Sequence, residues 1–145
     1  MALYTFDTSV IIAYRVTELP QNFLLSGVVI AELTAGARDD SNRKVFEAMR
    51  RDYDKLDALI VPTPDDWLTA SRILFWLSKG RKKKAGGKTP PLLPGASQRM
   101  FLDALIAVSA GRIGATVVTQ DWDDFKAIQY YCDVKLKRGA DFFMQ

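Results

Sequence analysis

Short apolar segments alternate along the chain with longer segments in which apolar residues recur at helical spacing. The short segments suit strands, and the longer ones suit helices that bury one face. Residues 22–25 form a strand or an extended lead-in to a helix, and the other expected strands are 3–6, 59–61, 115–119 and 134–136. The expected helices are 10–14, 28–37, 40–56, 64–79, 96–112 and 122–128. This order predicts an α/β sandwich with a central, mainly parallel, twisted sheet flanked by helices.

Local start and stop signals place several of these helices. The run Asp7-Thr8-Ser9 follows the first strand and can cap a helix. Ser26 can cap the next helix, and Gly36 helps to end it. Thr63-Pro64, with Asp66 behind it, combines a cap, a proline at the first helical position and an acid three residues after the cap.

The remaining segments complete a single domain over residues 1–145. The helix at 40–56 is expected to be amphipathic, with an apolar side made of Val45, Phe46, Met49 and Tyr53. The segment 80–95 is rich in glycine, proline, lysine and arginine, which predicts a basic loop. No internal repeat interrupts this order, and 145 residues suffice for one hydrophobic core.

Composition removes whole classes of chemistry. The chain has no histidine, which excludes Ser/His/Asp and Cys/His catalysis. Its single cysteine, Cys132, excludes an internal disulfide and a Cys/His zinc site. No apolar run approaches the ~18 residues of a membrane span, and the first residues do not resemble a signal peptide. We therefore expect a cytoplasmic protein without membrane contact, whose chemistry uses carboxylates, hydroxyls, lysine or an oxygen-held metal.

The net charge of +3 conceals a separation of charge along the chain. Residues 67–102 contain eight basic residues and no acidic one, whereas the remainder contains twelve basic and seventeen acidic residues. This pattern indicates one surface for a polyanion and another region rich in carboxylates.

Carboxylates are expected at the carboxyl edge of the sheet, where the working site of a parallel α/β fold lies. Asp7 directly follows the first strand, and Asp121 follows the strand 115–119 by two residues. Asp7 also suits a helix cap, a role that is compatible with a place in the crevice. Asp121 and Asp124 could instead form a cap and its reciprocal partner, which leaves a purely structural interpretation open.

Glu32 and Asp103 are notable because their helices are apolar around them. The residues three and four positions from Glu32 are Val28, Val29, Ala35 and Gly36. Asp103 carries the only charge between Met100 and Ala110. A buried lone carboxylate costs on the order of several kcal/mol unless it is paired, hydrogen-bonded or on a metal. Arg99, four residues earlier, could provide such a pair.

At least four acids thus converge on one end of the predicted sheet. Clustered carboxylates repel one another, and a divalent cation relieves that repulsion. Oxygen ligands without histidine or cysteine favour Mg²⁺ or Mn²⁺. Such an ion can activate water and stabilise the charge on a phosphodiester as it is cleaved.

Four short motifs in order resemble the PIN domain, and within it the VapC toxins of type II toxin–antitoxin systems. They are Asp7-Thr8-Ser9, Ala31-Glu32-Leu33 with Gly36, Asp103-Ala104-Leu105-Ile106-Ala107, and Val117-Val118-Thr119-Gln120-Asp121 ending in Asp124-Phe125. The resemblance runs from Leu3 to Phe125 and implies a Mg²⁺-dependent endoribonuclease, usually a homodimer, that a cognate antitoxin neutralises. Carried over by position, the acidic quartet is Asp7, Glu32, Asp103 and Asp121, with Ser9 and Thr119 as supporting hydroxyls. Asp124 also matches an acidic position of the last motif, so the fourth acid is either Asp121 or Asp124.

The basic segment is longer and more basic than a small toxin of this kind needs. Its cations could hold RNA phosphates, or they could form a solvated loop: Lys82, Lys83, Lys84, Lys88 and, just beyond, Arg99. Gly86-Gly87-Lys88-Thr89 resembles the end of a P-loop, but Lys82 occupies the position of the first glycine and Pro90-Pro91 blocks the helix. ATP binding is therefore not expected.

Two other interpretations compete with a nuclease. A haloacid-dehalogenase-type phosphotransfer protein needs a second acid two residues after the first, where Ser9 stands. A non-catalytic RNA- or protein-binding module would use the same acids as caps and ion pairs, and the sequence leaves this alternative open. Helical spacing assigns Trp67, Phe75 and Trp76 to the core or to a dimer interface.

Overall fold

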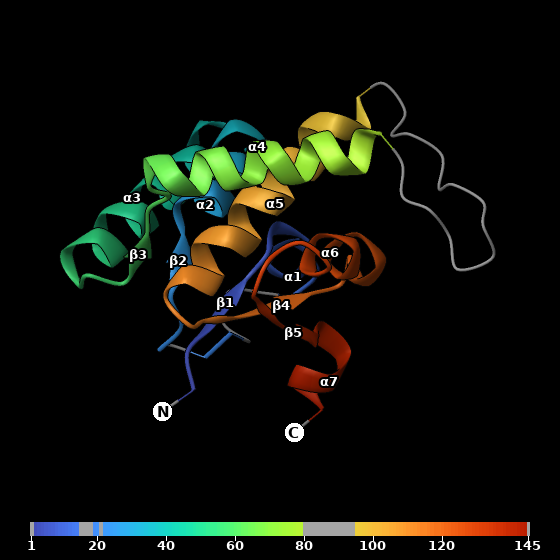
Figure 1. Cartoon of the computed structure of the whole chain (residues 1–145). Helices are drawn as coiled ribbons and strands as arrows, with labels where there is room; N and C mark the ends of the chain where they lie inside the picture. Colours follow the sequence, from blue (N-terminus) through green and yellow to red (C-terminus); the bar gives the residue numbers. More distant parts are fainter. Residues whose placement is uncertain (1, 15–18, 21, 80–94, 145) are drawn as a thin grey trace.

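The computed structural model describes residues 2–14, 19–20, 22–79 and 95–144. Its central sheet contains β1 (Tyr4–Phe6), β4 (Thr116–Thr119) and β5 (Lys135–Arg138) in the order β1-β4-β5, with both pairings parallel (Figure 1). A second parallel pair joins β2 (Leu25–Ser26) to β3 (Leu59–Ile60), and a bridge between Thr5 and Leu24 connects it to β1. The predicted parallel sheet is therefore confirmed.

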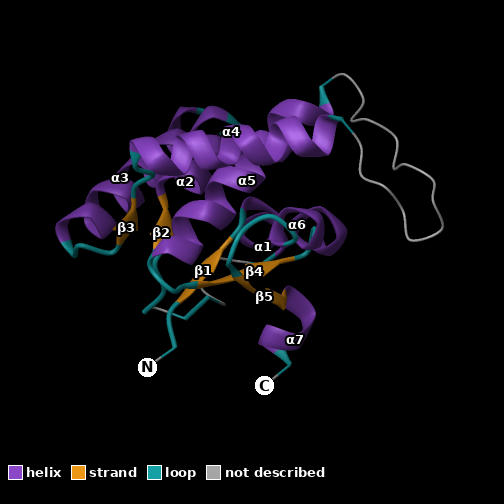
Figure 2. Ribbon diagram, in the orientation of Figure 1, coloured by secondary structure: helices purple, strands orange, loops and turns teal. Residues whose placement is uncertain are grey.

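Helices cover the sheet from both sides (Figure 2). In that view α2 (Gly27–Ala35), α4 (Pro64–Ser78) and α5 (Ala96–Arg112) lie above the sheet, and α7 (Gly139–Phe143) lies below it. The others are α1 (Thr8–Ala13), α3 (Asp40–Lys55) and α6 (Trp122–Gln129). The predicted sandwich of sheet and helices is thus present. No helix in the described ranges is long and apolar enough to cross a membrane.

The sequence signals at helix ends are used as expected. Ser26 caps α2 by accepting a hydrogen bond from the Val29 amide at 3.4 Å, and Gly36 ends the helix. At the start of α4, the Thr63 hydroxyl accepts from the Asp66 amide, and the Asp66 carboxylate accepts from the Thr63 amide. These local bonds explain why the bounds of both helices agree with the sequence to within two residues.

Two of the expected strands are displaced, and one helix is present that was not expected. The second strand lies at Leu25–Ser26 rather than 22–25, and the last strand begins at Lys135 and extends to Arg138 rather than ending at 136. Helix α7 was not expected at all. Lys135–Arg138 is mostly charged and lies at the edge of the sheet, where a strand needs fewer apolar residues. Neither β5 nor α7 therefore has a strong hydrophobic pattern in its own sequence.

The apolar side of α3 is narrower than expected. Phe46, Met49 and Tyr53 are half-buried against the core, whereas Val45 is 60% exposed. The helix lies on the surface beside α2 (Figure 1), so only one row of side chains reaches the core. Of the two alternatives for Trp67, Phe75 and Trp76, the structure excludes the core, because these residues are 48%, 57% and 42% exposed, and the dimer interface stays a prediction. Trp67 still contacts the ring of Phe101 on α5, and Trp76 stacks on Tyr131.

Helix α5 runs through the middle of the molecule, between α4 and the sheet. Its central residues Ala104, Leu105, Ile106 and Ala107 are at most 1% exposed. The strand β4 is equally enclosed, with Val117 and Val118 at 0%. A carboxylate placed on this helix or at the end of this strand is therefore close to the hydrophobic core.

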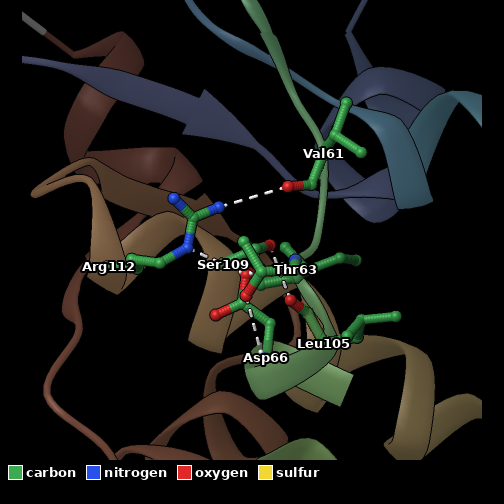
Figure 3. Close-up of polar contacts among 7 residues, drawn as sticks. Val61, Thr63, Asp66, Leu105, Ser109 and Arg112 are labelled. Atoms are coloured by element: carbon green, nitrogen blue, oxygen red, sulfur yellow. Dashed lines mark hydrogen bonds and ion pairs between the residues drawn. The ribbon is translucent and has the colours of Figure 1, made fainter.

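An ion pair joins the end of α5 to the start of α4 (Figure 3). The Arg112 Nε donates to Asp66 Oδ2 at 2.9 Å, and its Nη2 donates to the carbonyl of Val61 at 3.1 Å. The Asp66 side chain is 5% exposed and the Arg112 side chain 40%. Asp66 thus serves two purposes: it caps α4, and it holds α4 against α5.

Aromatic rings fasten α7 to the first strand. Phe142 lies edge-on to Tyr4 and Phe6 at centroid distances of 5.1 and 5.2 Å. Phe143 stacks on Tyr14 at 3.9 Å. Because Asp7 directly follows β1, the C-terminal helix packs against the strand that presents this carboxylate.

Candidate active site

Asp7 lies at the carboxyl end of β1 and caps α1. Its side chain is 1% exposed. Oδ1 accepts hydrogen bonds from the Ser9 hydroxyl at 2.6 Å and from the Val10 amide at 3.2 Å, and Oδ2 accepts from the Thr119 hydroxyl at 2.7 Å. Burial raises the pKa of Asp7, and these three hydrogen bonds oppose the rise. Asp7 therefore caps α1 and also borders the crevice.

Two hydroxyls connect Asp7 to the segment after β4. Thr119 donates to Asp7 and accepts from the Asp121 amide at 2.9 Å. Ser9 also donates to Asp7 and accepts from the Gln120 amide at 3.2 Å. The two hydroxyls therefore fix the orientation of the Asp7 carboxylate relative to the turn that carries Asp121.

Glu32 approaches from α2 and is held by Thr8, which belongs to the first sequence motif but was not predicted to have a role in the site. The Thr8 hydroxyl donates to Glu32 Oε1 at 3.1 Å. Burial raises the pKa of Glu32, the bond from Thr8 lowers it, and the charge of Asp7 raises it. The position of Thr8, first in the helix that Asp7 caps, is the signal that could have identified it.

Asp103 lies on α5, where its carboxyl faces four other acids. Its pKa rises from 3.8 to about 8, chiefly through burial and then through the charges of Asp7, Glu32, Asp121 and Asp124. The structure contradicts the proposed ion pair with Arg99, because no ion pair of the described residues involves either side chain. Arg99 instead lowers the pKa of Asp124, so its charge acts across the site rather than along its own helix.

Asp121 and Asp124 come from the start of α6. The Asp121 side chain makes no capping hydrogen bond, so the interpretation of this pair as a cap and its reciprocal partner is wrong. Burial raises the pKa of Asp124, and the charge of Asp121 raises it further. Both carboxylates are therefore available to the crevice.

These side chains line one cavity of about 370 Å³. Five carboxylates border it, contributed by the end of β1, α2, α5 and the start of α6: Asp7, Glu32, Asp103, Asp121 and Asp124. Ser9, Thr8 and Arg99 also line it, while Thr119 lies behind Asp7. Residues far apart in the sequence thus meet where sequence analysis expects them.

The chemistry of this donor set fits a hard divalent cation. All the donors are oxygens, and like charges raise the pKa of one another's carboxyls. Within the described ranges, no three acidic side chains are already close enough to hold a metal ion. A bound cation would therefore have to draw the carboxylates inward while it removed their mutual repulsion.

The predicted RNA-binding lysines Lys82, Lys83, Lys84 and Lys88 lie outside the described residues. Of the basic segment 80–95, only Gly95 is described, where it precedes α5 with a φ of 87°. Arg99, the remaining predicted RNA-binding residue, is on the wall of the acidic cavity.

Comparison with known proteins identifies the family of this fold. The family model of the PIN domain matches residues 4–129, which is most of the chain. No curated protein matches the sequence.

Several solved structures share the fold at low sequence identity. A chain from DNA-bound VapBC of Salmonella typhimurium matches with a TM-score of 0.58 and 17% identity, covering 96% of this chain and 99% of that one. A chain from VapBC-1 of nontypeable Haemophilus influenzae matches with a TM-score of 0.56 and 22% identity, covering 95% and 98%. A chain from DNA-bound VapBC2 of Rickettsia felis gives 0.56 and 17%, covering 94% and 98%.

Proposed function

This chain belongs to the PIN domain family, and on that premise we propose that it is a Mg²⁺- or Mn²⁺-dependent endoribonuclease. Members of the family are generally nucleases. The observation that carries the proposal is the meeting of carboxylates from four separate parts of the fold in one cavity. Carboxylates serving only as caps and ion pairs would not need to face one another.

The residues divide into those that would hold the cation and those that position them. Asp7, Asp103 and Asp121 would hold it, with Asp124 as the alternative to Asp121 and Glu32 as a further ligand or as the group that positions water. When bound, the cation lowers the pKa of water and stabilises charge on the phosphate. Ser9 and Thr119 orient Asp7, and its Oδ2, which accepts only from Thr119, keeps a lone pair for another partner. Thr8 does the same for Glu32.

Metal titration and RNA cleavage test this function together. Mg²⁺ or Mn²⁺ should raise the Tm of the protein by mass action, and RNA cleavage should stop when EDTA is added. Asp7→Asn and Asp103→Asn should abolish both responses. Asp133→Asn is a matched control, because Asp133 is exposed and does not line the cavity. Cleavage that survives both cavity substitutions would refute the proposal.

We also propose that the protein acts in the cytoplasm as the toxin of a type II toxin–antitoxin system, forms a homodimer and binds a cognate antitoxin. Support comes from the fold, which is shared with chains of VapBC complexes and with a chain of FitAB bound to IR36 DNA, at a TM-score of 0.56 and 18% identity. Expression should arrest growth, and co-expression of the product of an adjacent reading frame should restore it. Light scattering of the pure protein should give twice the mass of one chain.

A non-catalytic RNA- or protein-binding module on the same fold is the second candidate. The hydrogen bonds that Asp7 already makes as a helix cap favour it. Metal titration separates the two, because a capped, metal-free fold would keep its Tm when Mg²⁺ or Mn²⁺ is added.

A further inference from the structure

A second cavity adjoins the acidic one on the far side of Glu32. Its volume is about 300 Å³. Thr8, Ile12 and Glu32 line both cavities, so the two share a wall. The second cavity continues from α1 across α2 to α3, which lies beside α2 (Figure 1). A polymer bound at the carboxylates could therefore extend into the second cavity.

The lining of this second cavity combines an apolar side with a polar edge. Phe46, Leu33 and Ile11 supply the apolar surface. The polar groups are Arg38 and Asn42 at one edge and Thr8 and Glu32 on the shared wall. Ile12, on the wall shared by both cavities, is 74% exposed. An apolar surface with hydrogen-bonding groups at its edge suits an unstacked nucleobase, which proteins bind by stacking and by hydrogen bonds to its edge.

Asn42 is fixed so that it offers donors. Its Oδ1 accepts a hydrogen bond from the backbone N–H of Arg38 at 3.3 Å, and its backbone N–H donates to Asp39 Oδ1 at 2.8 Å. Its Nδ2 donates to no group of the described residues. The bond to Oδ1 fixes the orientation of the side-chain amide, so its two N–H groups remain for a ligand. The matching ligand edge carries a carbonyl oxygen or a ring nitrogen.

The mouth of the second cavity adds a cation. The Arg38 side chain is 82% exposed, and its Nε lies 4.0 Å from Asp39 Oδ2. An exposed ion pair of this kind contributes little to stability, so the guanidinium is available to a phosphate. The apolar lining, the amide donors and the adjacent cation match the face of a base, the hydrogen-bonding edge of that base and the phosphate of a nucleotide.

We infer that the cavity formed by Phe46, Asn42 and Ile12 binds the base next to the phosphate that is cut, and that Asn42 selects that base. This inference rests on the proposed ribonuclease function, because the shared wall places the base beside the carboxylates. Asn42 is a specificity-determining residue in this scheme and takes no part in the chemistry.

Sequencing the ends produced from a pool of short random RNAs tests the selection. The wild-type protein should prefer one base, or one pair of bases, at a single position beside the cut. Asn42→Ala should reduce that preference roughly tenfold, as expected for the loss of a buried hydrogen bond. Asn42→Asp replaces donors with acceptors and should shift the preference to bases whose edge carries an amino group.

Lys44→Ala is the matched control, since Lys44 is exposed on the same helix and does not line the cavity. Its cleavage pattern should equal that of the wild type. An identical base preference in wild type, Asn42→Ala and Asn42→Asp would overturn the inference. The Tm of each variant, measured alongside, shows that α3 remains folded.

A binding measurement separates this inference from the proposed function. The four nucleoside monophosphates, added one at a time in EDTA, should shift the NMR signals of the Asn42 side-chain amide. These signals are identified by their absence from Asn42→Asp. If these NMR signals shift but the protein cuts no RNA, the base site stands and the nuclease function is refuted. If the protein cuts RNA but the signals do not shift and Asn42 substitutions have no effect, the nuclease function stands and the base site is refuted.

Discussion

Thr119 shows how much one hydroxyl can determine. It is fully buried, donates to Asp7 and accepts from the Asp121 amide. Thr119→Val keeps the shape but leaves both groups short of a partner. We expect a loss of about 1–3 kcal/mol in the free energy of unfolding and weaker binding of Mg²⁺, because Asp7 would no longer be held in one orientation. Urea denaturation and metal titration of the same samples measure the two effects.

Ser9→Ala provides the comparison for this prediction. Ser9 also donates to Asp7, but it is only partly buried, so water can replace its bonds. Its loss of stability should be the smaller of the two. A valine at position 119 that leaves both stability and metal binding unchanged would contradict the role assigned to the hydroxyl.

Asp103 makes the metal-free protein sensitive to pH. Its folded-state pKa is about 8, above the usual value of 3.8. The folded protein therefore binds an extra proton between these pH values, and the stability this contributes is complete below about pH 4 and lost as the pH rises through 8. In EDTA, the Tm of Asp103→Asn minus that of the wild type should increase between pH 5 and 8 and level off above that.

A flat difference between pH 5 and 8 would show that the Asp103 carboxyl ionises freely. The expected size is several degrees, since 1 kcal/mol moves the Tm of a chain of this length by roughly 2–4 °C. Differential scanning fluorimetry resolves such a change.

At the scale of elements, the pair between Asp66 and Arg112 holds α4 against α5. Arg112→Ala would leave the buried Asp66 carboxylate with the Thr63 amide alone. We expect a loss of about 1–3 kcal/mol. Arg112→Lys should recover only part of it, because one ammonium cannot reproduce the forked contacts to Asp66 and Val61.

Chemical denaturation of these variants measures the contribution, with Arg72→Ala as the control. Arg72 is exposed on α4 and forms no ion pair within the described residues, so its replacement should stay within about 0.5 kcal/mol of the wild type. Equal free energies of unfolding for Arg112→Ala and Arg72→Ala would show that the pair between Asp66 and Arg112 does not stabilise the packing of α4 on α5.

The elements that sequence analysis located well are those with signals inside their own residues. Helix α4 begins at Pro64 because Thr63 and Asp66 cap each other, and this is legible in four consecutive letters. Helix α7 carries no such signal. Its five residues are held by Phe142 and Phe143 against rings from the first fourteen residues, and such distant contacts are invisible to local pattern.

The same distinction applies to the site. An isolated charge on an apolar helix made Asp103 conspicuous, and its meeting with the other acids followed from the topology of a parallel sheet. The direction of each side chain did not follow. Arg99 is spaced to pair with Asp103, yet it acts on Asp124, and Thr8 supports Glu32 across 24 positions of sequence.

At the scale of the whole molecule, the segregation of charge bears on how RNA would arrive. The acidic cavity repels phosphates, whereas the residues 67–102 carry eight basic side chains. Replacing Lys82, Lys83 and Lys84 with alanine should reduce the slope of log K against log salt by about 2 for single-stranded RNA, if each lysine neutralises one phosphate. Fluorescence anisotropy across a salt series measures the slope. An unchanged slope would show that these lysines do not contact RNA phosphates.

The aromatic attachment of α7 has a practical consequence for where this molecule can be divided. The match to the PIN domain stops at residue 129, but β5 and α7 follow it and complete the sheet and the covering of Phe6. A chain that ends at residue 129 would expose the unpaired edge of β4 and the ring of Phe6. We expect such a chain to self-associate. The end of the family match and the end of the folded unit therefore differ here.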